Sequence, residues 1–153
     1  MFRRRSKDRK GAAATEFAMI IPPILMLTFG TIEATSVIFL KEKITIAAHE
    51  GARVAIKKMS ELDDVETTIE GYLSQRSVDI SSLGSSAISV TPEPDRTEEL
   101  QAITVTITAP VTGNTLLPNS FYTWFGGRNV SATCVMYKEF THPDYEAELA
   151  AGG

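Results

Sequence analysis

A predominantly apolar run of 24 residues, from Phe17 to Leu40, constrains this chain more than any other feature. At about 1.5 Å of rise per residue, a helix of this length extends about 36 Å, enough to cross a hydrocarbon core of about 30 Å. No later stretch is long and apolar enough to form a second span. A secretory signal is disfavoured, because the run is about twice a typical apolar region and no small-x-small cleavage site follows.

The charges divide the chain into two opposed regions. Residues 1–11 hold six Lys or Arg and one acid, which leaves nine basic and eighteen acidic residues elsewhere. Cations beside a span stay on the cytoplasmic side, so we expect the chain beyond the span to lie outside. Because binding to nucleic acid needs clustered cations, the acidic chain that follows residue 11 is unsuited to it. We expect a basic leader (1–11), a transmembrane segment (12–40), an extracytoplasmic domain (41–140) and a flexible tail (141–153).

The helical pattern continues past the apolar run. Apolar and small residues recur at steps of three and four, with charged residues between them. This spacing predicts an amphipathic extension of the same helix, from Ala14 to Met59. The small side chains on its apolar side suit close packing against a sheet or another helix; they are Ala47, Ala48, Gly51 and Ala55.

Two carboxylates belong to the membrane-facing region. Glu16 lies at its cytoplasmic edge, where solvation or the helix dipole alone could account for an acid. Glu33 lies deeper, about 25 Å from Glu16 along a helix, with Thr28, Thr31 and Thr35 near it. Because an unpaired acid is costly in lipid, Glu33 predicts a partner helix; snorkelling to the outer interface is the alternative.

The spacing between Gly11 and Glu16 resembles that of a known family. The N-terminal quarter is similar to the TadE-like pseudopilins of the Flp (tight adherence) type IV pilus system. The residues that carry the resemblance are Gly11, Ala12 to Phe17, Pro22-Pro23 and Phe29 to Glu33.

This resemblance implies a maturation step and a set of assembly residues. In the type IV pilin class a membrane peptidase cuts after the glycine, which here places the cut between Gly11 and Ala12. Glu16 would then pair with the freed amino group of a neighbouring subunit's Ala12. The assembly residues are Glu16, Phe17 and Glu33. The small alanines that follow the cut differ from the aromatic residue typical of major pilins, which indicates a minor or accessory component.

The resemblance also implies location and partners. The expected location is the bacterial inner (cytoplasmic) membrane, with the N-terminus cytoplasmic and the C-terminal domain extracytoplasmic. The expected partners are the prepilin peptidase, other pilins and pseudopilins of the Flp (Tad) system, the inner-membrane assembly platform and membrane lipid. The alternative is an uncleaved single-pass protein whose outer domain binds a ligand.

Two features inside the span bear on its packing. Pro22 and Pro23 remove two backbone donors, so we expect a kink or a short non-helical link there. That bend either reflects the tolerance of membrane helices for proline or helps the N-terminal segment reach the peptidase and leave the bilayer. Gly30 and Ala34 form a small-xxx-small pair, which lets another helix approach closely.

The rest of the chain predicts a small mixed domain. Ser60 with the acids after it is typical of a helix start, and the helix ends near Arg76. Three alternating stretches then predict strands, at 87–91, 103–108 and 130–137. We therefore expect an α+β, pilin-like fold with a three-stranded antiparallel sheet packed on the long helix. A short helix is expected over 120–125, where aromatic residues gather to close the core or to contact another subunit; they are Phe121, Tyr122, Trp124 and Phe125.

The sequence holds little that suggests catalysis, metal binding or a cofactor. His49 has no second ligand nearby, and the acids at 61–66 lack the spacing and glycine of a calcium loop. Cys134, the single cysteine, falls on an apolar strand face without a basic neighbour at a recognisable spacing. We expect a protein that is not an enzyme.

Overall fold

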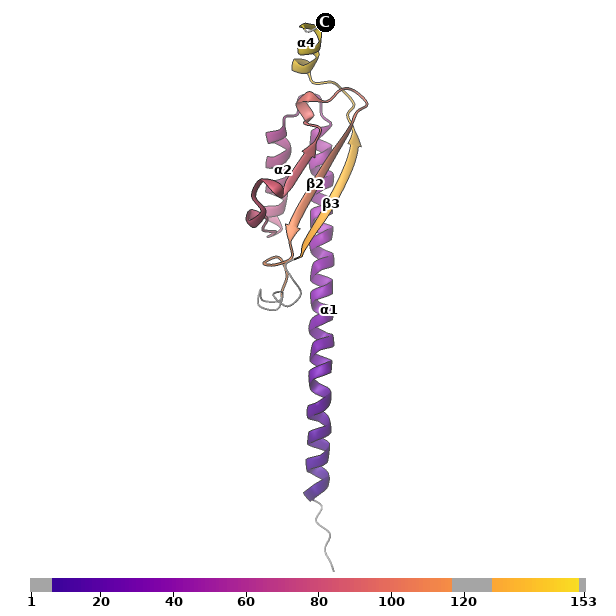
Figure 1. Cartoon of the computed structure of the whole chain (residues 1–153), viewed down its shortest axis with the longest axis vertical. Helices are drawn as coiled ribbons and strands as arrows, with labels where there is room; N and C mark the ends of the chain where they lie inside the picture. The colour runs from indigo at the N-terminus through magenta and orange to yellow at the C-terminus, as the bar shows by residue number, and fades with distance from the viewer. Residues whose placement is uncertain (1–6, 117–127, 152–153) are drawn as a thin grey trace, which may run out of the picture. The chain divides into compact units, whose positions relative to one another are not determined.

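The computed structural model describes residues 7–116 and 128–151 and divides into two units (Figure 1). The N-terminal unit ends at Thr35 and the C-terminal unit begins at Ser36. Helix α1 (Lys7–Ala55) contributes to both. The C-terminal unit adds α2 (Leu62–Gln75), η1 (Ser81–Ser86), β1 (Ile88–Thr91), η2 (Pro94–Arg96), β2 (Ala102–Pro110), β3 (Asn129–Tyr137) and α4 (Pro143–Ala151). These elements confirm the α+β class.

Helix α1 is longer at its start and shorter at its end than the sequence predicts. It begins at Lys7 and remains helical through Pro22 and Pro23. Of the two expected alternatives, a kink or a non-helical link, the link is wrong and the kink stays a prediction. Because the two prolines are adjacent, both missing donors fall within one turn, and hydrogen bonds on either side can hold the helix.

Helix α1 ends at Ala55, four residues before Met59. Its last turn tightens, since the backbone N–H of Lys57 bonds to the carbonyl of Val54 at 3.1 Å. The buried Ser60 hydroxyl then donates to the carbonyl of Ala55 at 3.3 Å and satisfies one of the free carbonyls at the helix end.

Ser60 therefore serves the end of α1, and the expectation that it starts the next helix is wrong by one residue. The N-cap of α2 is Glu61, whose backbone N–H bonds to the Asp64 carboxylate at 3.2 Å. The buried residues of α2 are Val65, Ile69 and Leu73, at the spacing of one helix face.

The sheet has the order β1-β2-β3 and is antiparallel throughout. Strand β2 is central, and alternate residues along it are fully buried: Ile103, Val105, Ile107 and Ala109. The threonines between them lie on the other face, where Thr106 and Thr133 hydroxyls are 3.0 Å apart. The predicted alternation is confirmed.

The core of the C-terminal unit lies between the sheet and the helices α1 and α2 (Figure 1). Helix α1 supplies mainly small side chains to it, and Gly51 marks the closest approach. A Cβ atom built on Gly51 would lie 2.6 Å from Cδ1 of Ile69 on α2 and 3.6 Å from Val105 on β2. The small residues predicted for close packing thus allow α1 to contact both a helix and the sheet.

Hydrogen bonds between residues far apart in the sequence join the outer segments of the C-terminal unit at two places. Asn114, after β2, accepts a hydrogen bond from the backbone N–H of Asp79 and donates to its carbonyl, both at 2.7 Å. On the other side, the Lys41 ammonium on α1 donates to the carbonyl of Ser131 on β3.

Residues Pro143–Ala151 form α4 within the segment expected to be a flexible tail. His142 precedes this helix: its carbonyl accepts from the backbone N–H of Glu146 at 3.0 Å, and its ring Nδ1 accepts from that of Asp144 at 3.3 Å. Proline at the first position and acids in the first turn also favour a helix start. The aromatic residues expected in a helix over 120–125 lie outside the described residues.

Candidate functional site

The N-terminal unit consists of apolar helix. Among the described residues one helix, Gly11–Ala55, is long and apolar enough to cross a membrane. Its apolar side chains are exposed from Phe17, at 65%, to Ile32, at 40%. Exposed apolar surface of this extent needs an apolar partner. An apolar helix near the N-terminus is suited to membrane anchoring.

The predicted processing residues lie inside this helix. Gly11 and Ala12 belong to α1, and the Thr15 hydroxyl donates to the carbonyl of Ala12 at 2.8 Å. Glu16 and Phe17 are exposed. Glu16 forms no ion pair with any side chain in the described part of the chain. Its carboxylate is therefore free to meet a group from another molecule.

Glu33 differs from the threonines around it. The Thr28, Thr31 and Thr35 hydroxyls each donate to a carbonyl of the preceding turn, at 2.7 to 2.9 Å. They need no partner helix to satisfy them. Both carboxylate oxygens of Glu33 are shielded from solvent and lack a hydrogen-bond partner among the described residues.

The small-xxx-small pair is open. Gly30 and Ala34 are both exposed, and no atom lies within 4 Å of a Cβ built on Gly30. The pair is accessible to a second helix. A Cβ on Gly51 would meet Ile69, whereas one on Gly30 would meet no atom of the described residues outside its own helix.

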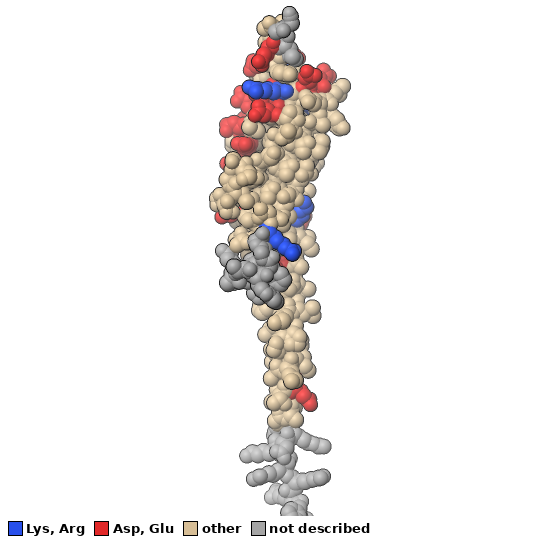
Figure 2. Space-filling model, viewed as in Figure 1, with Lys and Arg blue, Asp and Glu red and all other residues tan. Residues whose placement is uncertain are grey.

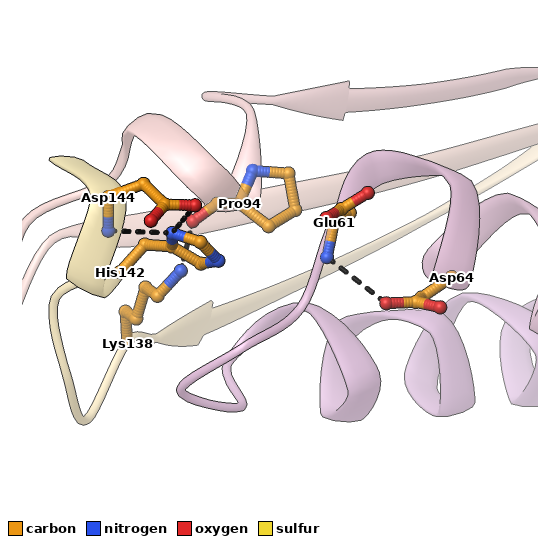
Figure 3. Close-up of polar contacts among 6 residues, drawn as sticks. All are labelled: Glu61, Asp64, Pro94, Lys138, His142 and Asp144. Atoms are coloured by element: carbon orange, nitrogen blue, oxygen red, sulfur yellow. Dashed lines mark hydrogen bonds and ion pairs between the residues drawn. The ribbon is translucent and has the colours of Figure 1, made fainter.

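The C-terminal unit buries a cation that sequence reasoning missed. Lys138 follows β3, has no exposed surface, and donates through Nζ to the carbonyl of Pro94 in η2 (Figure 3). Burial lowers the pKa of Lys138, and the nearby Asp95 carboxylate opposes that shift. A lysine after a strand carries no pattern that distinguishes a buried ammonium from a solvated one.

The lowered pKa of Lys138 predicts a pH dependence of stability. Between the folded-state pKa and the ordinary value of about 10.5, the unfolded chain binds more protons, so the free energy of unfolding contributed by Lys138 rises with pH. We expect Lys138→Met to flatten this rise and to impose a constant loss of about 1 kcal/mol for the unpartnered Pro94 carbonyl. Denaturant unfolding of the full chain in detergent between pH 8 and 10.5 measures both effects; parallel curves for the two proteins would contradict the first.

Neither His49 nor Cys134 gains a chemical role from its surroundings. His49 is exposed on α1. Cys134 is half-buried on the core side of β3, and burial raises the pKa of its thiol, which disfavours the reactive thiolate. In the described ranges, 7–116 and 128–151, no three His, Cys, Asp or Glu side chains are grouped to hold a metal ion.

Comparison with known proteins agrees with the N-terminal motif. The family model described as TadE-like protein matches residues 11–53. No curated protein matches the chain, and no solved structure does. TadE-like proteins are pilin-like components associated with Tad pili, structural rather than catalytic. Over residues 11–53, which run from the predicted cleavage site into the last turn of α1, the chain is matched by the TadE-like family, as its sequence predicts.

Proposed function

We propose that the chain is a TadE-like minor pilin or pseudopilin that is cut after Gly11 and acts in assembling Flp-type IV pili or the associated secretion machinery. The observation that carries this proposal is the match over 11–53, which includes the glycine, the acid and the exposed apolar helix. The basic leader would remain in the cytoplasm and the C-terminal unit would lie outside the inner membrane.

The burial of Leu40 shortens the proposed span. Leu40 is 2% exposed in the core of the C-terminal unit, so it is not available to lipid. The stretch from Phe17 to Thr35, the end of the N-terminal unit, has 19 residues. It would extend about 28 Å as a helix, close to the thickness of a hydrocarbon core. The proposed membrane segment therefore ends before Leu40.

Glu16 and Glu33 have different proposed roles. Glu16, exposed and without an ion pair among the described residues, would meet the freed amino group of Ala12 on a neighbouring subunit at the cytoplasmic edge of the span. A charge pair in a low-dielectric setting penalises misaligned neighbours, so it favours one axial register. Glu33 would take a hydrogen-bond donor from another pilin or pseudopilin, and Gly30 with Ala34 would let that helix approach closely. Phe17 would add apolar contact beside Glu16.

Processing gives the direct test of this proposal. Mass spectrometry of the protein extracted from its native membrane is expected to show an N-terminus at Ala12. Gly11→Leu should leave the leader attached, because a side chain at this position would obstruct the peptidase, whereas Gly30→Ala should be cut normally. An intact Met1 in the unaltered protein would instead support an uncleaved single-pass protein with an outer binding domain.

A further inference from the structure

The charges of the C-terminal unit are unevenly distributed. Between residues 36 and 153 the chain has nine Lys or Arg and sixteen Asp or Glu. On the face shown in Figure 2, acidic side chains gather mainly toward the end of this unit that carries α4. The opposite end, where α1 enters the unit, holds four of the nine cations. These four residues, here called the cationic end, are Lys41, Lys43, Arg76 and Arg128.

Hydrogen bonds to the backbone bring the cationic end together. The Lys43 ammonium donates to the carbonyl of Arg76, directly after α2, at 3.1 Å. The Lys41 ammonium donates to the carbonyl of Ser131 on β3, three residues after Arg128. The cationic end is therefore produced by the packing of α1 beside α2 and β3, and not by a run of basic sequence.

Acids do not neutralise the cationic end. None of its four side chains forms an ion pair within the described part of the chain. Glu42 and Asp79 lie in the same region, but the Asp79 carboxylate already accepts the backbone N–H of Ser81 at 2.9 Å. A positive excess therefore remains at this end of an acidic unit and can attract anions.

The guanidinium of Arg76 is held in an orientation that suits a phosphate. Its central carbon lies 3.6 Å from the centroid of the Tyr72 ring, the distance of a cation–π contact. This stacking fixes the plane of the guanidinium but leaves the N–H groups along its edge free, and Arg76 is exposed. Two parallel N–H groups of arginine match two oxygens of a phosphate.

Exposed apolar side chains accompany these cations. Ile38 and Phe39 precede Lys41 on α1, and Leu116, after β2, is 77% exposed. Lys41 lies six residues beyond Thr35, the end of the N-terminal unit, which is about 9 Å along a helix. The headgroup layer on each side of a bilayer is about 5–8 Å thick. Because lysine extends its ammonium toward polar surroundings, Lys41 is within reach of lipid headgroups.

We propose that the cationic end binds the phosphates of anionic phospholipids at the membrane surface from which the C-terminal unit projects. The proposal rests on the membrane anchoring proposed above and does not need cleavage after Gly11. Lipid offers phosphates to the cations and an apolar boundary to Ile38, Phe39 and Leu116. An acidic protein would supply only the negative charge, and it would have to displace the headgroups that already lie at this depth.

Hydrogen exchange of the full-length chain in nanodiscs tests the proposal. Ser77 and Asn114 report on the cationic end, because their backbone N–H groups form turn hydrogen bonds of 3.1 Å beside it. Their exchange should be about fivefold slower in discs of phosphatidylglycerol than in discs of phosphatidylcholine. The amide of Glu146, in α4 at the other end of the unit, should exchange equally in both lipids.

A triple variant removes three of the four cations. Lys43→Gln, Arg76→Gln and Arg128→Gln combined should abolish the difference between the two lipids, while Lys41 keeps its bond to β3. The variant faces the same anionic surface, so a slowing caused only by local pH would persist in it. Core amides of β2 should exchange in phosphatidylcholine as they do in the unaltered chain, which excludes misfolding.

A matched variant controls for general charge. Arg53→Gln, Lys57→Gln and Lys58→Gln remove three exposed cations near the other end of the same stretch of helix, and the slowing by phosphatidylglycerol should remain. Equal effects of the two triple variants, or equal exchange of the unaltered chain in the two lipids, would overturn this proposal alone. Slowing by polyglutamate in phosphatidylcholine, without slowing by phosphatidylglycerol, would indicate an acidic protein instead. A chain that entered neither kind of disc would overturn the proposed anchoring as well.

Discussion

Replacing Gly51 with alanine is expected to lower the free energy of unfolding of the C-terminal unit by about 1–2 kcal/mol. The added Cβ would lie 2.6 Å from Cδ1 and 2.7 Å from Cγ1 of Ile69, which is fully buried. Either Ile69 leaves its rotamer or α1 moves away from α2. The better helix propensity of alanine offsets only about 1 kcal/mol of this cost.

Hydrogen exchange of core amides in the full chain, in detergent, measures this loss in the relevant unit. Gly71 on α2 is the matched control, because a Cβ built there meets no atom within 4 Å. Gly71→Ala should therefore be neutral or stabilising by up to about 1 kcal/mol. Ile69→Ala removes both Cδ1 and Cγ1, the two atoms that the added Cβ would meet, so Gly51→Ala should cost less in that background. An equal cost in both backgrounds would show that the contact with Ile69 is not the cause.

Replacing Glu16 with alanine is expected to reduce surface pili about a hundredfold while cleavage after Gly11 continues. Without the carboxylate, the Ala12 amino group of a neighbouring subunit would enter the membrane edge unpaired, and breaking such a pair typically costs about 3–5 kcal/mol. Electron microscopy of cell surfaces measures the pili, and mass spectrometry measures processing in the same cells.

The matched control for this substitution is Glu42→Ala. Glu42 is also an exposed acid on α1, but it lies in the C-terminal unit. Cells that carry Glu42→Ala should therefore have as many surface pili as cells with the unaltered protein. If Glu16→Ala cells assembled pili normally, Glu16 would have no assembly role, even where cleavage had been demonstrated.

Much of the fold follows from local patterns in the sequence. The alternation of Ile103, Val105 and Ile107 with threonines predicts a half-buried strand, and β2 is that strand. The four-residue spacing of Val65, Ile69 and Leu73 similarly predicts the buried face of α2. In the N-terminal unit, the sequence predicts the apolar helix and the TadE-like match that begins at Gly11.

What the sequence could not predict depends on contacts between distant residues. Asn114 bonds to Asp79, 35 positions away, and Lys138 bonds to Pro94, 44 positions away. Neither asparagine nor lysine has a preference for such a distant backbone partner, so no local sequence pattern predicts these hydrogen bonds. The end of α1 at Ala55 is a similar case, because the Ser60 hydroxyl satisfies the helix end instead of starting α2. The cationic end also forms only after α1, α2 and β3 are brought together.

The hydrogen bond from Lys41 to Ser131 protects part of the sheet edge at β3 from pairing with another copy of the chain. In an antiparallel sheet, alternate residues of an edge strand direct their backbone N–H and C=O groups toward the neighbouring strand. Even-numbered residues do so here, since the N–H of Lys138, just after β3, donates to the carbonyl of Gln101, just before β2. The backbone groups of Ser131 therefore point toward the free edge of the sheet. A free edge without charged side chains invites strand addition and aggregation. The ammonium of Lys41 occupies one of its acceptors. In the proposed membrane-anchored state, where copies lie close together, this contact would hinder strand pairing between two copies at Ser131.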